Sequence, residues 1–573
     1  MVFTLLMPVP GWAQALEFFT PVLTGKADDL DAVQERKLDQ IAKRPTSASV
    51  TLVRLNEAAS KAGSLRMTIP DRKPLDFARV QLESHSASNV IWSGKLSARN
   101  GTATLVFRNG NVTGTVTEEG NLYGIEPIGN GLHALIKVDT AKFPPDESPS
   151  FLERERRAAP LPKAASSSPA TDGPITINLL VAYTRSASGA VGDIDATIQL
   201  AMAEANQSYI NSNVNLRLKM VSTFEVTYSE SGKDYDQILV DLKKMNDVLN
   251  SRNITGADIA MLVVNQDESC GQADEILATA PTAFAAVHIG CATGYYSFAH
   301  ELGHLQGARH NMGNDPTQTP FAYGHGHQHT SSAPAWRTIM AYECKGECAR
   351  LQYWSNPDVN YNGFPMGTAD TSNNARVLNE TAATIAAFRN TQAYTRCAAE
   401  HENCSFSGTR TVAYGANDKF VYRTASNGIA CDNGAFGDPL PGVPKACYVA
   451  RIGYEKCANE WGNCVFNGTQ FVAFGAGSKF AFKLASGSIG CNYDVFGDPA
   501  FGTPKACYIG PAGFTYCAAE NGQCAVSGTK TVAYGANGQF FYRTVSGPIA
   551  CSDDAFGNPA VGIGKACFVG PAL

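Results

Sequence analysis

The pattern of hydrophobic and polar positions in residues 16–150 predicts mostly strands. Runs such as ASVTLVRL, TATLVFRN and LHALIKVD are rich in β-branched residues and are separated by Gly, Asn and Asp, which favour turns. One early segment, LDAVQERKLDQIA, has apolar residues at helical spacing. We therefore expect a folded α+β unit here, and it contains no cysteine.

Residues 174–391 show a different pattern, in which apolar strands alternate with amphipathic helices. The strand signals are ITINLLVAYT, LRLKMVSTFEV and ADIAMLVV, and the helical signals between them are IDATIQLAMAEANQSYI and YDQILVDLKKMNDVL. Such alternation predicts an α/β domain with a twisted sheet flanked by helices. We expect a last strand, AFAAVHIG, at the edge of this sheet.

The segment that joins these units, residues 151–173, has a composition that cannot bury a core. It is rich in Pro, Ser, Ala and charge, so we predict an exposed linker that is cleaved during maturation. A folded unit, a cleavable linker and a second domain follow one another in a zymogen. Residues 16–150 are then the pro-domain.

The C-terminal part repeats with a period of 60 residues. Cysteines at 397, 404, 431 and 447 recur 60 and 120 positions later, which defines copies at 395–454, 455–514 and 515–573. Short strands, many glycines and four cysteines per copy predict three small β-rich modules, each closed by two internal disulfides. Four cysteines allow three connectivities within a copy.

Composition and the N-terminus indicate the compartment. The 16 cysteines all lie at or after Cys270, as expected for disulfides made in an oxidising environment. Residues 1–15 are apolar and end in Ala-Gln-Ala, which is typical of a signal peptide, although a buried strand is the alternative and a basic start is missing. No other apolar run approaches the ~20 residues of a membrane helix. The net charge of −6 disfavours a nucleic-acid partner. We expect a secreted monomer.

The stretch HELGHLQGARH, residues 300–310, carries the chemistry. His300 and His304 are about 400° apart on a helix, so both imidazoles project from one face. Gly307 can end the helix and turn the chain so that His310 returns to the same point. Three imidazoles predict a Zn²⁺ site with an open fourth position. Glu301, beside that position, is the expected general base for water that attacks a carbonyl.

This motif, HExxHxxGxxH, resembles the signature of the metzincin zinc endopeptidases, in which a methionine turn follows; here TIMAY supplies Met340. Residues 174–391 look like reprolysin-like enzymes, and among these most like the bacterial peptidyl-Asp metallopeptidases. The resemblance implies two subdomains around a zinc cleft, with substrate paired to the edge strand AFAAVHIG. It also implies hydrolysis of proteins or peptides, with cleavage beside acidic residues.

Two departures from the family pattern concern individual residues. Asn311 follows the third histidine where many reprolysins have aspartate. Tyr342 lies two residues after the turn methionine, as in astacins and serralysins, so it is a candidate for a role in the transition state; packing in the lower subdomain is the alternative.

Further metal sites, latency and cysteine pairing give additional hypotheses. His325, His327 and His329 would share one face of a strand and could bind a second metal, although a loop is the alternative. Asn311 and Asp315 are candidates to hold Ca²⁺. Because the pro-domain lacks cysteine, a thiolate cannot block the zinc. If a side chain does so, Asp146 is the candidate, with a solvated loop as the favoured alternative, and steric cover by the folded unit suffices.

We expect disulfides between Cys270 and Cys291 and between Cys344 and Cys348. A metal-binding pair in CKGEC is the alternative for the second, which export and the histidine site for zinc disfavour.

The repeats are expected to attach the enzyme to polysaccharide, cell surface or insoluble protein. Three copies would raise avidity. Tyr414, Phe474 and Tyr534 occupy equivalent positions and could stack on sugars, or instead fill small cores. The alternative function for the whole chain is an adhesin in which the repeats do the main work. An intact Glu301 disfavours it, since a binding protein has no need of a general base.

Overall fold

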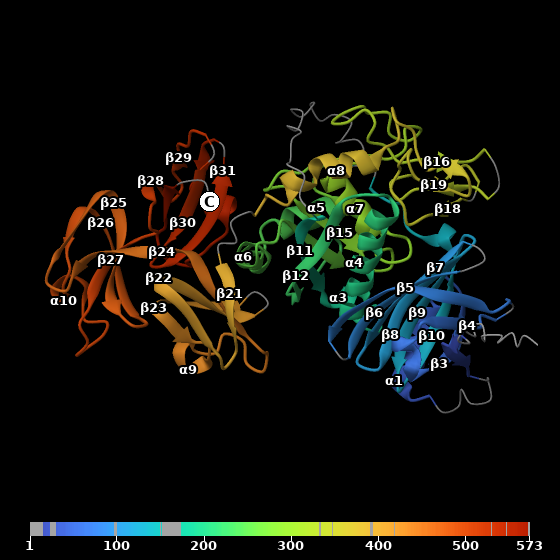
Figure 1. Ribbon diagram of the computed structural model, residues 1–573, viewed down its shortest axis with the longest axis horizontal. Helices are drawn as coiled ribbons and strands as arrows, with labels where there is room; N and C mark the ends of the chain where they lie inside the picture. The colour runs from blue at the N-terminus through green and yellow to red at the C-terminus, as the bar shows by residue number, and fades with distance from the viewer. Residues whose placement is uncertain are drawn as a thin grey trace, which may run out of the picture.

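The computed structural model describes residues 15–22, 30–70, 72–86, 88–96, 100–148, 151, 173–331, 334–346, 348–389, 394–416, 419–528, 530–545 and 547–570. Figure 1 shows three parts: an N-terminal unit in blue, a central unit in green and yellow, and the C-terminal repeats in orange and red. The predicted signal peptide and nearly all of the predicted linker lie outside the described residues.

In the part of the N-terminal unit that the structure describes, a ten-stranded sheet is accompanied by one α-helix, α1 (Ala32–Ala42), and two short 3-10 helices. Asp31 caps α1, since its carboxylate accepts from the backbone N–H groups of Val33 and Gln34. Trp92, Phe77 and Leu105 are fully buried in the core of the sheet. In spatial order, its strands are β1 (Leu16–Glu17), β4 (Ser64–Met67), β5 (Leu75–Ser86), β6 (Asn89–Leu96), β7 (Gly101–Arg108), β8 (Asn111–Glu118), β9 (Asn121–Gly129), β10 (Leu132–Val138), β3 (Ser47–Leu55) and β2 (Phe19–Pro21).

The central unit is built on a five-stranded sheet, as the alternating pattern predicts. Its spatial order is β12 (Leu216–Val226), β11 (Ile175–Thr184), β13 (Ile259–Val264), β15 (Phe284–His288) and β14 (Gly271–Ala273). Neighbouring strands are parallel except β14, which runs antiparallel to β15. The helices are α3 (Arg185–Gly189), α4 (Ile194–Asn211), α5 (Tyr235–Leu242), α6 (Asn246–Thr255), α7 (Ser297–Leu305) and α8 (Asn374–Ile385).

The two faces of this sheet have separate cores. Alternate residues of β11 point to opposite faces: Leu179 packs in the core that contains residues of α4, α7 and α8, and Leu180 in the core that contains residues of α5 and α6. Each core excludes water from one face, which is why β13 is apolar along its whole length and β11 is apolar from Leu179 to Ala182.

The prediction of which strand lies at the edge of the sheet is wrong. AFAAVHIG forms β15, which pairs with β13 on one side and β14 on the other, so it is interior. The edge is β14, the three residues Gly271, Gln272 and Ala273. So short a strand without a β-branched residue produces no periodic signal in the sequence.

The described residues of the loop-rich region that follows His310 form a three-stranded sheet and a two-stranded sheet of very short strands. They are β16 (Gln328–His329), β17 (Trp336–Arg337), β18 (Ala349–Arg350), β19 (Asn360–Tyr361) and β20 (Phe364–Pro365). Among the described residues, no helix is long and apolar enough to cross a membrane.

The repeats form the predicted disulfides within each copy. The first cysteine pairs with the second and the third with the fourth, as in Cys397–Cys404 and Cys431–Cys447. The first two copies share one sheet because β24 (Ala446–Asn459) runs from one into the other.

The remaining elements of the repeats are β21 (Tyr394–Ala399), β22 (Asn403–Ala416), β23 (Lys419–Ala430), α9 (Asn433–Phe436), β25 (Asn463–Ala476), β26 (Lys479–Gly490), α10 (Tyr493–Phe496), β27 (Ala506–Gly510), β28 (Thr515–Ala519), β29 (Gln523–Cys524), β30 (Lys530–Ala536), β31 (Gln539–Val545), β32 (Ile549–Ala550), α11 (Asp553–Phe556) and β33 (Ala566–Gly570). Tyr414, Phe474 and Tyr534 are all fully buried, so they fill the cores of the modules and cannot stack on a ligand.

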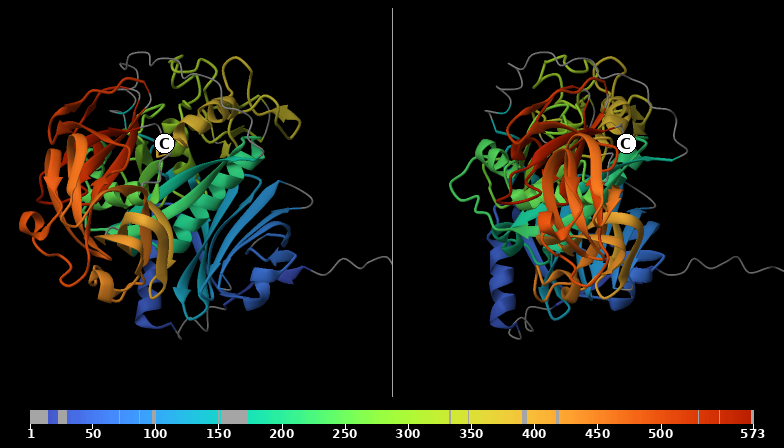
Figure 2. Two further views of the ribbon diagram at one scale, coloured as in Figure 1. Left: turned by 60° about the vertical axis from the view of Figure 1, so that its left-hand side comes forward. Right: turned by 90° about the vertical axis from the view of Figure 1, so that its left-hand side faces the viewer.

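The N-terminal unit packs on α4 of the central unit (Figures 1 and 2). Val106 of β7 and Leu200 of α4 share a small apolar cluster, and Arg108 forms ion pairs with Asp193 and Asp195 at the start of α4. Glu204 of α4 is also buried at this contact, where it accepts hydrogen bonds from Thr115 of β8 and from the backbone N–H of Gly294. Burial raises the pKa of Glu204 to about 7.

Glu204 should make stability depend on pH. The folded chain keeps this proton up to about pH 7, whereas the unfolded chain releases it near pH 4.5, so the free energy of unfolding falls as pH rises through this range. Glu204→Gln mimics the protonated acid. The stability of Glu204→Gln does not change with the protonation of residue 204. The free energy of unfolding of the variant minus that of wild type should therefore rise by up to about 3 kcal/mol between pH 5 and pH 8, measured by urea unfolding of the full chain. The exposed control Glu83→Gln should track wild type; parallel profiles for wild type and Glu204→Gln would contradict the burial argument.

Candidate metal centre

Helix α7 and the turn after it bring three histidines to one point. His300 and His304 project from one face of α7, which ends at Leu305. Gly307 follows with φ of +100°, a conformation that glycine adopts without strain, and the chain returns so that His310 faces the other two. The three Nε2 atoms lie 3.1 Å from one another. The predicted ligand residues are thus together in space.

The opposite ring nitrogens of two histidines contact polar groups. His300 Nδ1 lies 2.9 Å from the carbonyl oxygen of Ile339 and 2.7 Å from Nη2 of Arg350, and His304 Nδ1 lies 2.9 Å from the carbonyl oxygen of Ala308. A carbonyl can only accept, so Nδ1 of His304 carries the proton and the lone pair of its Nε2 faces the cluster. Three Nε2 atoms that meet at one buried point form an arrangement that a cation stabilises.

A fourth group, which the sequence did not indicate, completes the cluster. Oε1 of Glu147 lies 2.5 Å from His304 Nε2, 3.6 Å from His300 Nε2 and 3.5 Å from His310 Nε2. The Glu147 side chain is fully buried, and its two oxygens have no hydrogen-bond partner among the described residues. Glu147 and the three histidines are also the one group of three or more metal-ligating side chains in the described part of the chain.

The choice of Asp146 as the blocking carboxylate is therefore wrong by one residue. Oδ1 of Asp146 lies 2.7 Å from Nη1 of Arg350, and its neighbour Glu147 faces the histidines. The two adjacent side chains face different groups, so a shift of one residue exchanges their partners. The sequence KFPPDE does not reveal which carboxylate has which direction.

Glu301 lies beside this cluster and is completely buried. Burial, and then the nearby charge of Glu147, raise the pKa of Glu301 well above its ordinary value. A Cβ atom on Gly271 would lie 2.5 Å from Oε1 of Glu301, so the glycine of edge strand β14 leaves the space that this carboxylate fills. Its two oxygens have no hydrogen-bond partner among the described residues.

The floor of the site is closely packed. Met340 is fully buried, and a Cβ atom on Gly303 of α7 would lie 2.8 Å from its sulfur and 2.6 Å from the ring of Trp354. The glycine thus lets α7 approach the methionine turn. The ring of Tyr342 lies 4.2 Å from that of His310, between centroids, so this tyrosine borders the metal-binding cluster.

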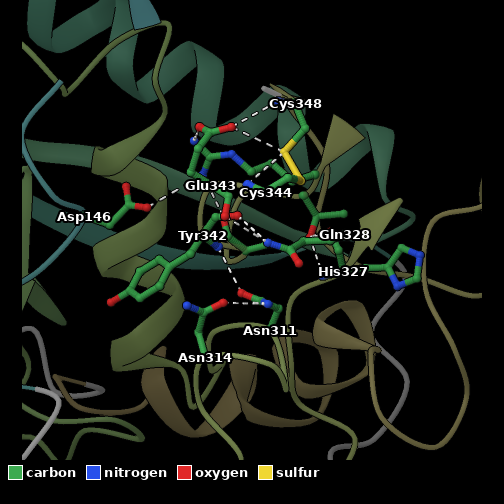
Figure 3. The surroundings of a disulfide bond; sticks show 12 residues. Asp146, Asn311, Asn314, His327, Gln328, Tyr342, Glu343, Cys344 and Cys348 are labelled. Carbon is green, nitrogen blue, oxygen red and sulfur yellow. Dashed lines mark hydrogen bonds and ion pairs between the residues drawn. A yellow bond between two sulfur atoms is a disulfide. The ribbon is translucent and has the colours of Figure 1, made fainter. Parts of the chain in front are cut away.

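The residues predicted to form further metal sites make other contacts in the structure. His325 donates from Nδ1 to the carbonyl oxygen of His310, and His329 stacks on Trp336. Asp315, proposed for calcium, is ion-paired with Arg309 at 2.8 Å. The amide oxygen of Asn311 accepts from the backbone N–H of Tyr342 (Figure 3).

Both disulfides expected in the central unit are present. They are Cys270–Cys291 and Cys344–Cys348, and the second lies close to Tyr342 and Glu343 in Figure 3. With the six disulfides in the repeats, they account for all 16 cysteines. The prediction of a disulfide-rich chain is confirmed.

Comparison with known proteins gives consistent matches. Residues 174–355 match the model of metallo-peptidase family M12. A peptidyl-Asp metalloendopeptidase of Stenotrophomonas maltophilia is 38% identical over 409 residues, which cover 67% of this chain and 96% of the relative. One from Xanthomonas campestris is 38% identical and covers 62% and 90%. One from Pseudomonas fragi is 42% identical over 188 residues, or 32% of this chain and all of the relative. This chain therefore belongs to the same family and is a metalloendopeptidase.

Proposed function

We propose that this chain is a secreted, zinc-dependent endopeptidase that is made as a zymogen and hydrolyses extracellular proteins. The observation that carries this proposal is the convergence of three buried Nε2 atoms beside a buried carboxylate, Glu301. Tetrahedral ligands about 2.0–2.1 Å from zinc lie about 3.3 Å from one another, close to the 3.1 Å that separates these atoms. Eight disulfides support export to an oxidising compartment.

The mechanism assigns each group one task. His300, His304 and His310 would hold Zn²⁺, which when bound supplies a Lewis acid for the scissile carbonyl and the attacking water. Glu301 accepts the proton of that water and later returns it to the leaving amine. We assign Tyr342, at the border of the cluster, to hydrogen bonding in the transition state.

Latency follows from the position of Glu147. Residues 16–150 act as a pro-domain, and the carboxylate of Glu147 takes the place that water needs beside the three imidazoles. The backbone carbonyls of Pro145 and Asp146 accept hydrogen bonds of 2.7 and 3.2 Å from the N–H groups of Cys270 and Gly271. The segment thus lies on edge strand β14, where we expect substrate to bind.

Two further parts of the proposal concern the substrate. We extend to this chain the peptidyl-Asp cleavage that the names of its relatives state. The C-terminal repeats attach the enzyme to polysaccharide or cell surface. Exposed aromatics such as Trp461 and Phe501, at 60% and 94% exposure, are the candidates for contact in place of the buried Tyr414, Phe474 and Tyr534.

Glu301→Gln tests the general base. The activated variant should hydrolyse casein about 10²–10⁴-fold more slowly than wild type, because the amide cannot accept the proton of water. Its metal content, measured by atomic absorption, should equal that of wild type, since Glu301 is outside the ligand set. A chelator should abolish wild-type activity, and added zinc should restore it. Casein cleavage that persists both in Glu301→Gln and in wild type treated with the chelator would refute the proposal.

Glu147→Gln tests the latency ligand in the full chain. With Co²⁺ substituted for zinc, the visible spectrum of the unprocessed variant should differ from that of the unprocessed wild type, because a carboxylate ligand is lost. Activation after limited proteolysis should also become faster. The control Glu83→Gln, an exposed carboxylate of the same unit, should give the wild-type spectrum. Identical spectra for Glu147→Gln and wild type would show that this carboxylate does not contact the metal.

A further inference from the structure

Two buried arginines of the central unit meet a carboxylate of the N-terminal unit next to the metal-binding histidines. Nη1 of Arg350 lies 2.7 Å from Oδ1 of Asp146, and Nη1 of Arg337 lies 3.7 Å from Oδ2. The three side chains are only 2%, 1% and 6% exposed. We call the space between the two guanidinium groups, which Asp146 fills, the acid pocket.

The pocket is held in shape by groups of the central unit alone. Arg350 donates to the carbonyl oxygens of Ile339 and Tyr295, and Arg337 donates to the carbonyl oxygen of Ala341 and to the Tyr295 hydroxyl. Both guanidinium groups lie over the Tyr295 ring, at 4.7 and 5.4 Å from its centroid. The arginines are therefore fixed in place without help from Asp146.

The charge of the pocket is balanced only while Asp146 is present. Arg337 has a second carboxylate partner, Glu343, at 2.7 Å, but that side chain is half exposed. Among the described residues, Asp146 is the one carboxylate within ion-pair distance of Arg350. A buried guanidinium without an anion is unfavourable. When the N-terminal unit leaves, the pocket needs another carboxylate.

The position of the pocket is that of a residue beside the scissile bond. Nη2 of Arg350 lies 2.7 Å from Nδ1 of His300, so the pocket adjoins the metal site. Asp146 directly precedes Glu147, whose carboxylate lies among the imidazoles, and its own backbone pairs with Gly271 of β14. A peptide extended along β14 can therefore place one acidic side chain in the pocket while its backbone crosses the metal site.

We infer that Arg350 and Arg337 are the specificity-determining residues of this peptidase, which bind the aspartate side chain of the substrate, and that Asp146 occupies their pocket before activation. The inference rests on the proposed peptidase function and deepens it. Arg350 makes the direct charge-assisted hydrogen bond, and Arg337 adds its charge from 3.7 Å. One segment of the chain thus fills two subsites, with Asp146 in the acid pocket and Glu147 at the metal ligands.

A purely structural role predicts a different outcome. Arg350 and Arg337 also hold the backbone on both sides of Met340, through Ile339 and Ala341. If this were their whole contribution, substitution would slow cleavage of all peptides by the same factor. A recognition role instead changes the ratio between peptides that differ only in one charge.

The test measures kcat/KM for two peptides that differ only by Asp or Asn at the cleavage position. The full chain is expressed, cleaved in the linker and freed of its N-terminal unit. We expect the kcat/KM of wild type to be about 10–100-fold higher for the Asp peptide, because that peptide alone forms a charge-assisted hydrogen bond with Arg350. Arg350→Gln should reduce this ratio to near 1, Arg350→Lys should retain part of it, and Arg376→Gln, an exposed control on α8, should leave it unchanged.

The outcomes separate the two levels of the proposal. If wild type cleaves neither peptide nor casein, the proposed function fails. If wild type cleaves but Arg350→Gln keeps the wild-type ratio, or slows both peptides equally, the acid pocket is refuted while the peptidase remains.

A second measurement needs no arginine variant. The synthetic peptide KFPPDESP, residues 142–149, is used as an inhibitor of the activated wild-type enzyme. Replacing the aspartate that corresponds to Asp146 by asparagine should weaken inhibition by at least about 10-fold. Equal inhibition by the two peptides would overturn the inference even if Arg350→Gln does not fold.

Discussion

Three imidazole nitrogens that converge on one buried point are the constraint on which the rest of the structure depends. The backbone carbonyl of Ala308 holds the proton of His304 on the far side of its ring, so the facing nitrogen of His304 is free to bind a cation. The close contact of α7 with Met340, which Gly303 permits, and the turn at Gly307 both serve to bring these rings together. Glu301 depends on the same packing, since Gly271 leaves the space for it.

The N-terminal unit contributes carboxylates that pair with the imidazoles and guanidinium groups of the central unit. It places one carboxylate among the imidazoles and the next against two buried guanidinium groups. Each of these charges would be costly to bury alone, and each is compensated by the other unit. The contact therefore depends on the same groups that catalysis and recognition would use. On the function that we propose, inhibition and substrate binding would use the same surface along β14.

Much of this arrangement could be predicted from the sequence, and the limits have physical causes. The spacing of His300, His304 and His310 fixes their relative directions once a helix and a glycine turn are assumed, so local rules suffice. The 60-residue period likewise defines the repeats, whereas the choice among three disulfide connectivities in each copy came only from the folded modules. The identity of the edge strand could not be predicted, because β14 has three residues and its place in the sheet is set by tertiary pairing.

The roles of the two acidic residues and the two arginines were hidden for a related reason. Asp146 and Glu147 are adjacent, and only the folded segment decides which faces the histidines. Arg337 and Arg350 lie thirteen positions apart on different short strands, and their pocket is completed by a residue some two hundred positions away. No periodic pattern in the sequence indicates that these three residues are in contact.

X-ray absorption at the zinc edge of the purified full chain tests the central claim most directly. The account predicts one zinc ion per chain with three imidazole ligands and one carboxylate oxygen. A chain that contains no metal, or an ion bound by fewer than three imidazoles, would contradict it.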